Sequence, residues 1–222
     1  MANVNKIEQY NKGTVFPDSY EETYLATKHI SDIKLAIPND IFKKLKQKIE
    51  EKGLYFGDDS VLRNIIAGII KGNIILQGPP GTGKTTLAKI ICDVFEVAYT
   101  EATANSDWTT YDSIGGLQPS ANDEGHEVIE GKNGYVVSSI LKCCDLIVKN
   151  ENDNGTLQGN WLILDELNRC EIDKVFGDLF TALGSDASET ERVINLWYQK
   201  DENKKMVYIP NRYRIIGAMN NI

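Results

Sequence analysis

Nine consecutive residues of the chain have the types and the spacing that bind phosphate groups. The first eight fit the pattern G-x-x-x-x-G-K-[ST], and the nine are Gly78, Pro79, Pro80, Gly81, Thr82, Gly83, Lys84, Thr85 and Thr86. Glycines let backbone N–H groups point inward around phosphate oxygens, and a helix that follows adds the positive end of its dipole. In this pattern Lys84 reaches the outer phosphates and the hydroxyl of Thr85 binds Mg²⁺. The stretch therefore predicts a site for a nucleoside triphosphate and Mg²⁺.

A second candidate site is the run Trp161–Glu166, an apolar segment that ends in two carboxylates. The carboxyl end of a parallel strand is where ligands bind in an open α/β sheet. We expect Asp165 to hold the Mg²⁺ shell, and Glu166 to orient or deprotonate an attacking water. Taken alone, the pair also fits a strand that ends in a charged turn. The phosphate-binding pattern upstream favours the functional interpretation.

Short apolar segments must position these residues. The runs 73–77, 97–103, 161–166 and 213–220 predict strands, and the run 73–77 is expected to be buried on both faces. A helix from Thr85 should turn an inner side toward the sheet, formed by Leu87, Ala88, Ile90, Ile91, Val94 and Phe95. The predicted fold class is α/β: a P-loop NTPase three-layer fold with a parallel sheet, two hairpin insertions and an N-terminal helical segment.

The remaining segments complete this prediction. Amphipathic helices are expected at 41–51, from 58 to Gly72, after Val137, and at 172–183. One hairpin should pair 127–130 with 135–137 around a turn at 131–134, and another should pair 192–197 with 206–210. Residues 105–116 and 150–159 are expected to be loops.

Composition limits the function classes. With 222 residues, 41% of them hydrophobic, the chain can form one sizeable core. A net charge of −8 argues against a broad nucleic-acid surface. No transmembrane run or signal peptide is visible, so we expect a cytoplasmic protein with no membrane partner. The cysteines lack zinc-site spacing and are expected to be reduced and buried; they are Cys92, Cys143, Cys144 and Cys170.

Three blocks together resemble a known family: 78–86, the run Leu164-Asp165-Glu166-Leu167-Asn168-Arg169, and 216–220 with the sequence Ile-Gly-Ala-Met-Asn. They resemble the AAA+ ATPases of the dynein-related branch, which includes MoxR-type chaperones and McrB-type restriction GTPases. The likeness covers 37–222, and no role is assigned to 1–36. It implies that the strand ending at Asn220 lies between the other two site strands, so that this sensor 1 residue sits between Lys84 and Glu166.

The resemblance also implies finer roles. Asn105 is expected to hold Glu166 away from water until a ring assembles, and the segment 54–56 to contact the base. The hairpins near 127–137 and 192–210 resemble the helix-2 insert and the insertion before sensor 1. The part 132–135 is expected to touch a threaded client, with a solvated hairpin as the equal alternative.

One departure from the family concerns the carboxyl end. The sequence stops two residues after Asn220, so the arginine finger, a fifth core strand, the sensor 2 arginine and the lid have no counterpart. The arginines Arg169, Arg212 and Arg214 do not occupy the finger's usual place. We therefore expect a truncated chain that leaves the first strand as a sheet edge and hydrolyses nucleotide slowly.

The resemblance implies an ATP- or GTP-dependent enzyme in a homo- or hetero-oligomeric ring, acting on a protein or nucleic-acid client. The sequence leaves two alternatives open. One is a nucleotide-gated assembly module with little turnover, and the other is a GTP-dependent restriction motor subunit. The phosphate-binding loop cannot distinguish the bases, because it contacts phosphates alone.

Overall fold

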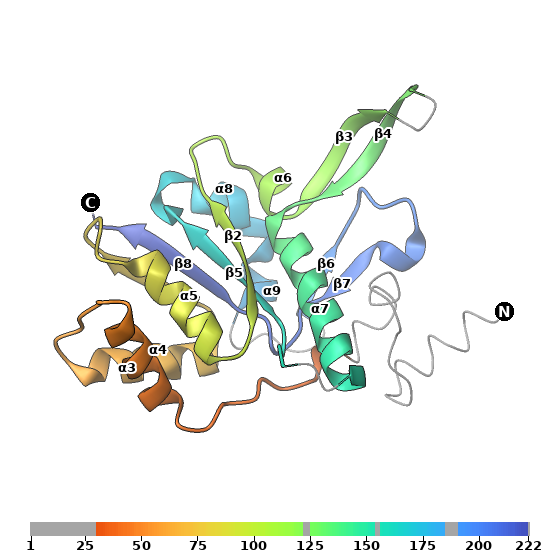
Figure 1. Cartoon of the computed structure of the whole chain (residues 1–222). Helices are drawn as coiled ribbons and strands as arrows, with labels where there is room; N and C mark the ends of the chain where they lie inside the picture. Colours follow the sequence, from red (N-terminus) through yellow and green to blue (C-terminus); the bar gives the residue numbers. More distant parts are fainter. Residues whose placement is uncertain (1–29, 122–124, 154–155, 185–190, 222) are drawn as a thin grey trace.

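The computed structural model describes residues 30–121, 125–153, 156–184 and 191–221 (Figure 1). Its central sheet is parallel, in the order β1-β8-β5-β2. The strands are β1 (Ile74–Gly78), β2 (Ala98–Thr103), β5 (Asn160–Asp165) and β8 (Ile215–Asn220). In register, Gly78 lies opposite Asn220 and Thr103 opposite Asp165, so the carboxyl ends of the strands lie at the same edge. The predicted place of the last strand, between the first strand and the 161–166 strand, is confirmed.

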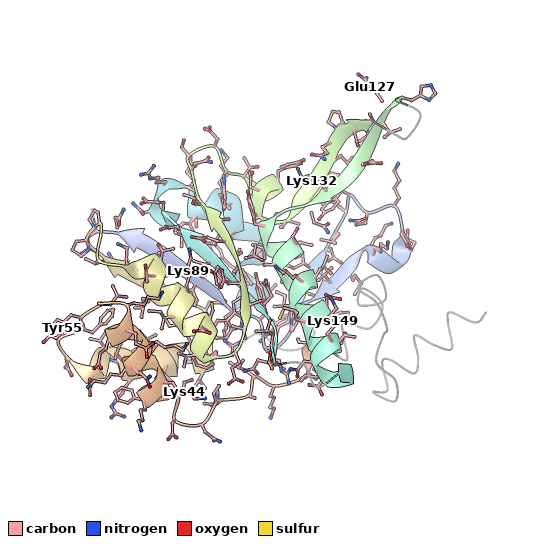
Figure 2. All side chains as sticks on the ribbon, viewed as in Figure 1. Lys44, Tyr55, Lys89, Glu127, Lys132 and Lys149 are labelled. Carbon is pink, nitrogen blue, oxygen red and sulfur yellow. The ribbon has the colours of Figure 1, made fainter. Side chains whose placement is uncertain are left out.

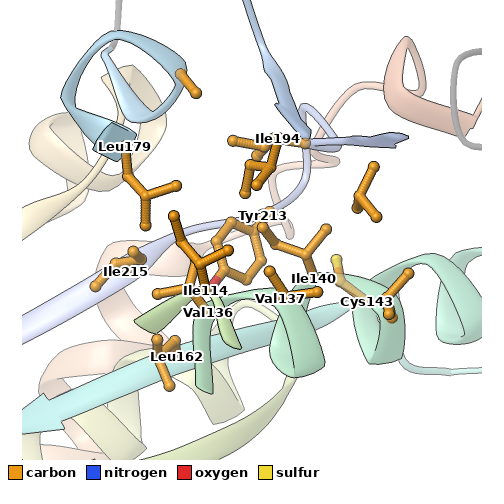
Figure 3. Close-up of a cluster of buried hydrophobic side chains, with 14 of the residues drawn as sticks. Ile114, Val136, Val137, Ile140, Cys143, Leu162, Leu179, Ile194, Tyr213 and Ile215 are labelled. Carbon is orange, nitrogen blue, oxygen red and sulfur yellow. The ribbon is translucent and has the colours of Figure 1, made fainter. Parts of the chain in front are cut away.

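Helices cover both faces of this sheet. On one face pack α3 (Ile41–Glu51), α4 (Asp59–Lys71) and α5 (Lys84–Val94). On the other pack α7 (Tyr135–Asp153), α8 (Ile172–Phe176), η2 (Gly177–Leu179) and α9 (Phe180–Leu183). Alternate residues of β5 supply the two cores, with Trp161 and Ile163 in the first and Leu162 and Leu164 in the second, the cluster drawn in Figure 3. The predicted three-layer α/β fold is confirmed.

The strand β1 differs from expectation in its burial. It lies at the end of the sheet, with β8 as its partner, and the side chain of Ile75 is 55% exposed. Burial on both faces was therefore the wrong prediction for this strand. Its position as an edge agrees with the expectation that it lacks a second neighbour.

The first hairpin is displaced from its predicted position. It pairs β3 (Gly115–Ala121) with β4 (Glu127–Asn133), and α7 begins at once after Gly134. The expected turn at 131–134 is wrong, because residues 131–133 belong to β4. The sequence of β3 did not indicate a strand, since it contains Gly and Pro, which are depleted in strands. A short helix, α6 (Thr110–Ser113), lies within the expected loop and begins at a capping box formed by Thr109 and Asp112.

Other differences are smaller. The second hairpin is confirmed, as β6 (Val193–Asn195) pairs with β7 (Met206–Tyr208), and η3 (Glu202–Lys204) lies between them. The helix predicted over 172–183 is divided at Gly177, a poor helix former, although its apolar side remains buried. The helix α7 extends to Asp153 and includes the start of the loop expected at 150–159.

Residues 30–36 are the described part of the N-terminal segment. Ile30 is fully buried in the second core, and the backbone of Ala36 exchanges hydrogen bonds with the side chain of Gln158. The boundary at residue 36 stays a prediction. Among the described helices, none combines the length and the apolar character needed to cross a bilayer.

Candidate nucleotide-binding site

The loop between β1 and α5 has a backbone that requires glycine. Gly81 and Gly83 have φ values of +75° and +80°, the left-handed region that residues with a Cβ rarely adopt. At Gly83 a Cβ would also lie 2.5 Å from Cδ2 of Leu54, so packing against Leu54 also excludes a larger residue here. Gly83 is the N-cap of α5, whose first N–H groups therefore open toward the loop.

Lys84, the first residue of α5, points back into this loop. Its Nζ donates hydrogen bonds to the carbonyl oxygens of Gly78, at 3.0 Å, and Pro79, at 2.8 Å. It also donates to Oδ1 of Asn220 at the end of β8, at 2.9 Å. The ammonium thus lies inside the turn, where phosphate oxygens could replace the carbonyl oxygens as its hydrogen-bond acceptors.

Thr85 and Asp165 bring two possible metal-binding oxygens together. Oγ1 of Thr85 donates to Oδ2 of Asp165 over 2.8 Å, while Oδ1 of Asp165 accepts from the backbone N–H of Glu166, also at 2.8 Å. A hydroxyl and a carboxylate at this spacing fit Mg²⁺, which prefers oxygen ligands and is commonly held by one or two carboxylates.

Glu166 is held from two directions. Nδ2 of Asn220 donates to both of its carboxylate oxygens, and Nε of Arg169 donates to Oε2 at 3.0 Å. The backbone of Glu166 has φ +54°, a left-handed conformation that is uncommon for a residue with a side chain. The side chain of Asn168 accepts from the backbone N–H of Asn220 at 3.2 Å, which ties the turn after β5 to the end of β8.

The structure therefore brings Lys84, Thr85, Asp165, Glu166 and Asn220 to one edge of the sheet, from α5, β5 with the turn that follows it, and β8. Their roles in binding and catalysis remain predictions. From the sequence, no contact was expected for Asn168 or Arg169. Their place in the run that follows Asp165 is the signal that could have found them.

The contact expected between Asn105 and Glu166 is not formed. Oδ1 of Asn105 accepts from the backbone N–H of Asp107 at 2.9 Å, and its predicted contact with Glu166 is replaced by those of Asn220 and Arg169. In the segment 54–56, Leu54 lies over Gly83, whereas Tyr55 is 89% exposed and projects into solvent (Figure 2).

The remaining arginines and the hairpin have local partners. Arg212 is buried and paired with Glu151, whereas Arg214 is buried and donates to backbone carbonyls. In the part 132–135, Lys132 is exposed on β4 (Figure 2), and the ring of Tyr135 stacks on Trp108 with centroids 5.2 Å apart. Contact of this part with a client remains a prediction.

The same residues connect the chain with known proteins. The family model of the AAA domain of the dynein-related subfamily matches residues 73–222, from the start of β1 to beyond β8. The chain belongs to the dynein-related AAA family. The predicted resemblance is confirmed, and the α/β fold agrees with that of a P-loop NTPase.

Several proteins are similar to this AAA domain. The type IV methyl-directed restriction enzyme EcoKMcrB subunit of Escherichia coli is 28% identical over 156 residues, which are 68% of this chain and 31% of that protein. An uncharacterised protein of Staphylococcus epidermidis is 28% identical over 96 residues, 43% of this chain and 30% of its own length. The chain thus spans about a third of the curated relatives that it matches.

A solved structure is also similar. The crystal structure of a candidate ATPase from Cytophaga hutchinsonii is 19% identical and has a TM-score of 0.47, and the match covers 82% of this chain and 44% of that one.

Proposed function

We propose that this AAA domain binds a nucleoside triphosphate with Mg²⁺ at the loop 78–86 and hydrolyses it. The observation that carries the proposal is the chain of contacts from Lys84 through Asn220 to Glu166 beside the Thr85–Asp165 pair. One edge of the sheet thus carries a cation that can bind phosphate, two oxygens that can bind a metal ion, and a carboxylate that can accept a proton from water. These are parts that phosphoryl transfer to water uses.

Lys84 is proposed to bind the outer phosphates. Its Nζ now has three oxygen acceptors, and phosphate oxygens would replace the two carbonyls of Gly78 and Pro79. Thr85 and Asp165 would hold Mg²⁺, which neutralises phosphate charge when it is bound. The contact between Oγ1 of Thr85 and Oδ2 of Asp165 keeps both oxygens on the same side of the loop.

Glu166 is proposed as the residue that orients or deprotonates the attacking water. A carboxylate at hydrogen-bond distance from water can accept its proton. Asn220 fixes the direction of this carboxylate through two hydrogen bonds, and also touches Lys84. Asn220 is therefore proposed to align the carboxylate with the outermost phosphate.

The Glu166→Gln variant tests this assignment. We expect it to bind nucleotide within about threefold of the parent chain and to lose hydrolysis by about a hundredfold or more, since a neutral amide cannot accept the proton. Equilibrium binding of a fluorescent nucleotide and release of phosphate would be measured on the same preparations. Unchanged turnover would overturn the assignment.

The isolated chain is proposed to turn over slowly. Within the described residues, the cations at this site are Lys84 and Arg169, and Arg169 is paired with Glu166. Phosphoryl transfer often gains about a thousandfold or more from an arginine that contacts the transferred group. Turnover that rises with protein concentration would support assembly into a homo-oligomeric ring, whereas a hetero-oligomeric ring would need a second subunit.

ATP is the proposed nucleotide, and GTP is the alternative. The segment 54–56 lies beside Gly83 and is proposed to contact the base. Titration of ATP against GTP, with and without Mg²⁺, would decide between them. The proposed work of the ring is to remodel a protein or nucleic-acid client in the cytoplasm.

Two other functions remain in competition with this one. The similarity to the restriction enzyme subunit favours a GTP-dependent restriction motor as the second candidate. A nucleotide-gated assembly module is the third, and Glu166→Gln distinguishes it from a motor. In the module, assembly should survive the substitution, whereas a motor should keep binding nucleotide and lose work on its client.

A further inference from the structure

A cavity lies at the opposite end of the sheet from the nucleotide site. It is formed where β1 and β8 begin, beside the carboxyl ends of α4 and α9, and includes Asn73, Leu183 and Tyr213 in its wall. In Figure 1 this end is remote from the C mark, which lies beyond the carboxyl end of β8. Its volume is about 330 Å³.

The charged residues of this cavity are all cations. They are Lys34, Lys71, Arg192 and Arg214, and no Asp or Glu is among the described residues of the lining. Acidic residues outnumber basic ones by 32 to 24 in the whole chain, so this lining departs from the composition. Within the described ranges, none of the four cations forms an ion pair with a carboxylate.

Two of the cations are at least partly buried in the wall of this cavity. Arg214 is buried, and its guanidinium donates to four backbone carbonyls, among them Ile69 and Ile70 at the end of α4. Arg192 donates from Nη2 to the carbonyl oxygen of Pro210 at 3.1 Å. Its Nε is buried and has no hydrogen-bond partner, and no other buried side-chain nitrogen or oxygen of the described residues is in this state.

The two positively charged guanidinium groups also repel each other. Burial lowers the pKa of Arg192, and burial together with the charge of Arg192 lowers the pKa of Arg214 to about 10. An anion between them would relieve this repulsion and supply an acceptor for Nε of Arg192. Guanidinium groups suit this role, because their planar N–H donors match phosphate oxygens.

We infer that this cavity is a binding site for a small phosphorylated anion, separate from the nucleotide site. Arg192 supplies the unpaired donor, Arg214 supplies a second fixed charge, and the exposed Lys34 and Lys71 attract the ligand at the rim. Four cations match a phosphate dianion better than a single carboxylate, because the phosphate group has more charge and more acceptor oxygens.

The test uses the 222-residue chain with Lys84→Ala, so that the loop 78–86 does not compete for phosphate. Calorimetric titration with inorganic phosphate and with glycerol 3-phosphate, at constant ionic strength, measures the dissociation constants and shows which source binds more tightly. We expect Arg192→Met to weaken binding about tenfold or more, and Lys71→Met about threefold. Lys142→Met, on the exposed side of α7, is the control and should change nothing.

Circular dichroism and melting temperature would show that the variants are folded, and Lys71→Met keeps the test valid if Arg192→Met does not fold. Binding that is equal in all variants would overturn the inference, as would acetate that binds as tightly as phosphate. Phosphate binding that appears only after Asp186→Asn and Glu189→Gln, in the sequence between Gly184 and Arg192, would also overturn it, since the chain's own carboxylates would then be the ligands.

Discussion

Asn220 donates hydrogen bonds from one side-chain nitrogen to both carboxylate oxygens of Glu166, over 3.1 and 3.2 Å. Its side-chain oxygen accepts from Lys84 at 2.9 Å. This bridge is possible because β8 lies between the strand that leads into the loop and the strand that ends at Asp165. The strand order therefore places an amide between the proposed phosphate-binding cation and the proposed catalytic carboxylate.

Replacement of Asn220 by Ala tests this bridge. We expect hydrolysis to fall by about a hundredfold, the usual cost of one lost donor at a reacting centre. Nucleotide affinity should change much less, because the contacts of Lys84 with Gly78 and Pro79 still hold its ammonium inside the loop, where phosphate binds. Phosphate release and nucleotide binding would be measured with Asn221→Ala as the control, since Asn221 is exposed and its contact with Gly78 uses the backbone. Equal loss in both variants would refute a specific role.

Replacement of Lys84 by Ala should weaken nucleotide binding. Because charge-assisted hydrogen bonds to phosphate are among the strongest in proteins, we expect at least about a tenfold rise in the dissociation constant. Lys89→Ala is a matched control on the same helix, as Lys89 is paired with Glu101 at 2.7 Å. Fluorescence titration would compare the two variants. Similar affinities would contradict the proposed site.

The hydroxyl of Thr85 should determine the response to Mg²⁺. Thr85→Val keeps the shape of the side chain and removes the contact with Asp165, whereas Thr85→Ser keeps the hydroxyl. We expect the valine variant to bind nucleotide with little dependence on Mg²⁺ and the serine variant to resemble the parent. Nucleotide titrations over a series of Mg²⁺ concentrations would measure this. A serine variant as defective as the valine variant would argue against metal binding.

The sequence predicted β5 and β8 because each is a dense apolar run, and it predicted β2 because its residues alternate. Between Asn160 and the polar ends, β5 and β8 consist of Trp, Leu, Ile, Gly, Ala and Met, as expected of strands covered on both faces. The loop was equally clear, since the φ values of Gly81 and Gly83 make glycine necessary there. These residues were identifiable because a single local constraint determines each of them.

The first hairpin depended on pairing between strands, and the contact of Arg169 with Glu166 depended on the local backbone of a turn. Gly115 pairs with Asn133, and a Cβ on Gly115 would lie 2.1 Å from the carbonyl oxygen of Lys132, which the pattern of β3 does not reveal. The contact of Arg169 with Glu166 follows from the turn after β5, where Glu166 has a positive φ. Sequence spacing alone could not have chosen it over Asn105.

The buried cysteines predict a dependence of stability on pH. Burial raises the pKa of Cys92 and Cys143 to about 12, and that of Cys144 well above its usual value. Their thiols stay neutral in the folded chain above pH 9 until the pH approaches these raised values, while thiols of the unfolded chain ionise above about 8.5. The contribution of these neutral thiols to the stability of the fold is therefore complete below the pKa of the unfolded chain. It is lost as the pH rises through the pKa of the folded chain.

Urea unfolding at pH 8 and pH 10 would measure this loss. The parent chain should lose more stability between the two pH values than a Cys92→Ala variant, by up to about 1.4 kcal/mol per pH unit above the unfolded pKa. In the same way, a thiol reagent at pH 8 should label these cysteines after unfolding and scarcely before. Rapid labelling of the native chain would show that the thiols are accessible.

Replacement of Trp161 by Phe should lower the free energy of unfolding substantially. The side chain of Trp161 is fully buried at the start of β5, its ring lies 5.2 Å from that of Phe95, and its Nε1 donates to the carbonyl oxygen of Arg212 at 2.7 Å. Trp161→Phe removes this hydrogen bond, leaves a buried carbonyl without this donor and opens a void. We expect a loss of about 2–4 kcal/mol in the free energy of unfolding.

The control for this change is Trp197→Phe, because the side chain of Trp197 is 68% exposed. We expect it to stay within about 0.5 kcal/mol of the parent in the same urea titration. The two variants remove the same atoms, so the difference between them isolates burial and the bond to Arg212. If both variants unfolded at the parent's urea concentration, Trp161 would not be the anchor between β5 and the helices α3, α4 and α5 that the packing indicates.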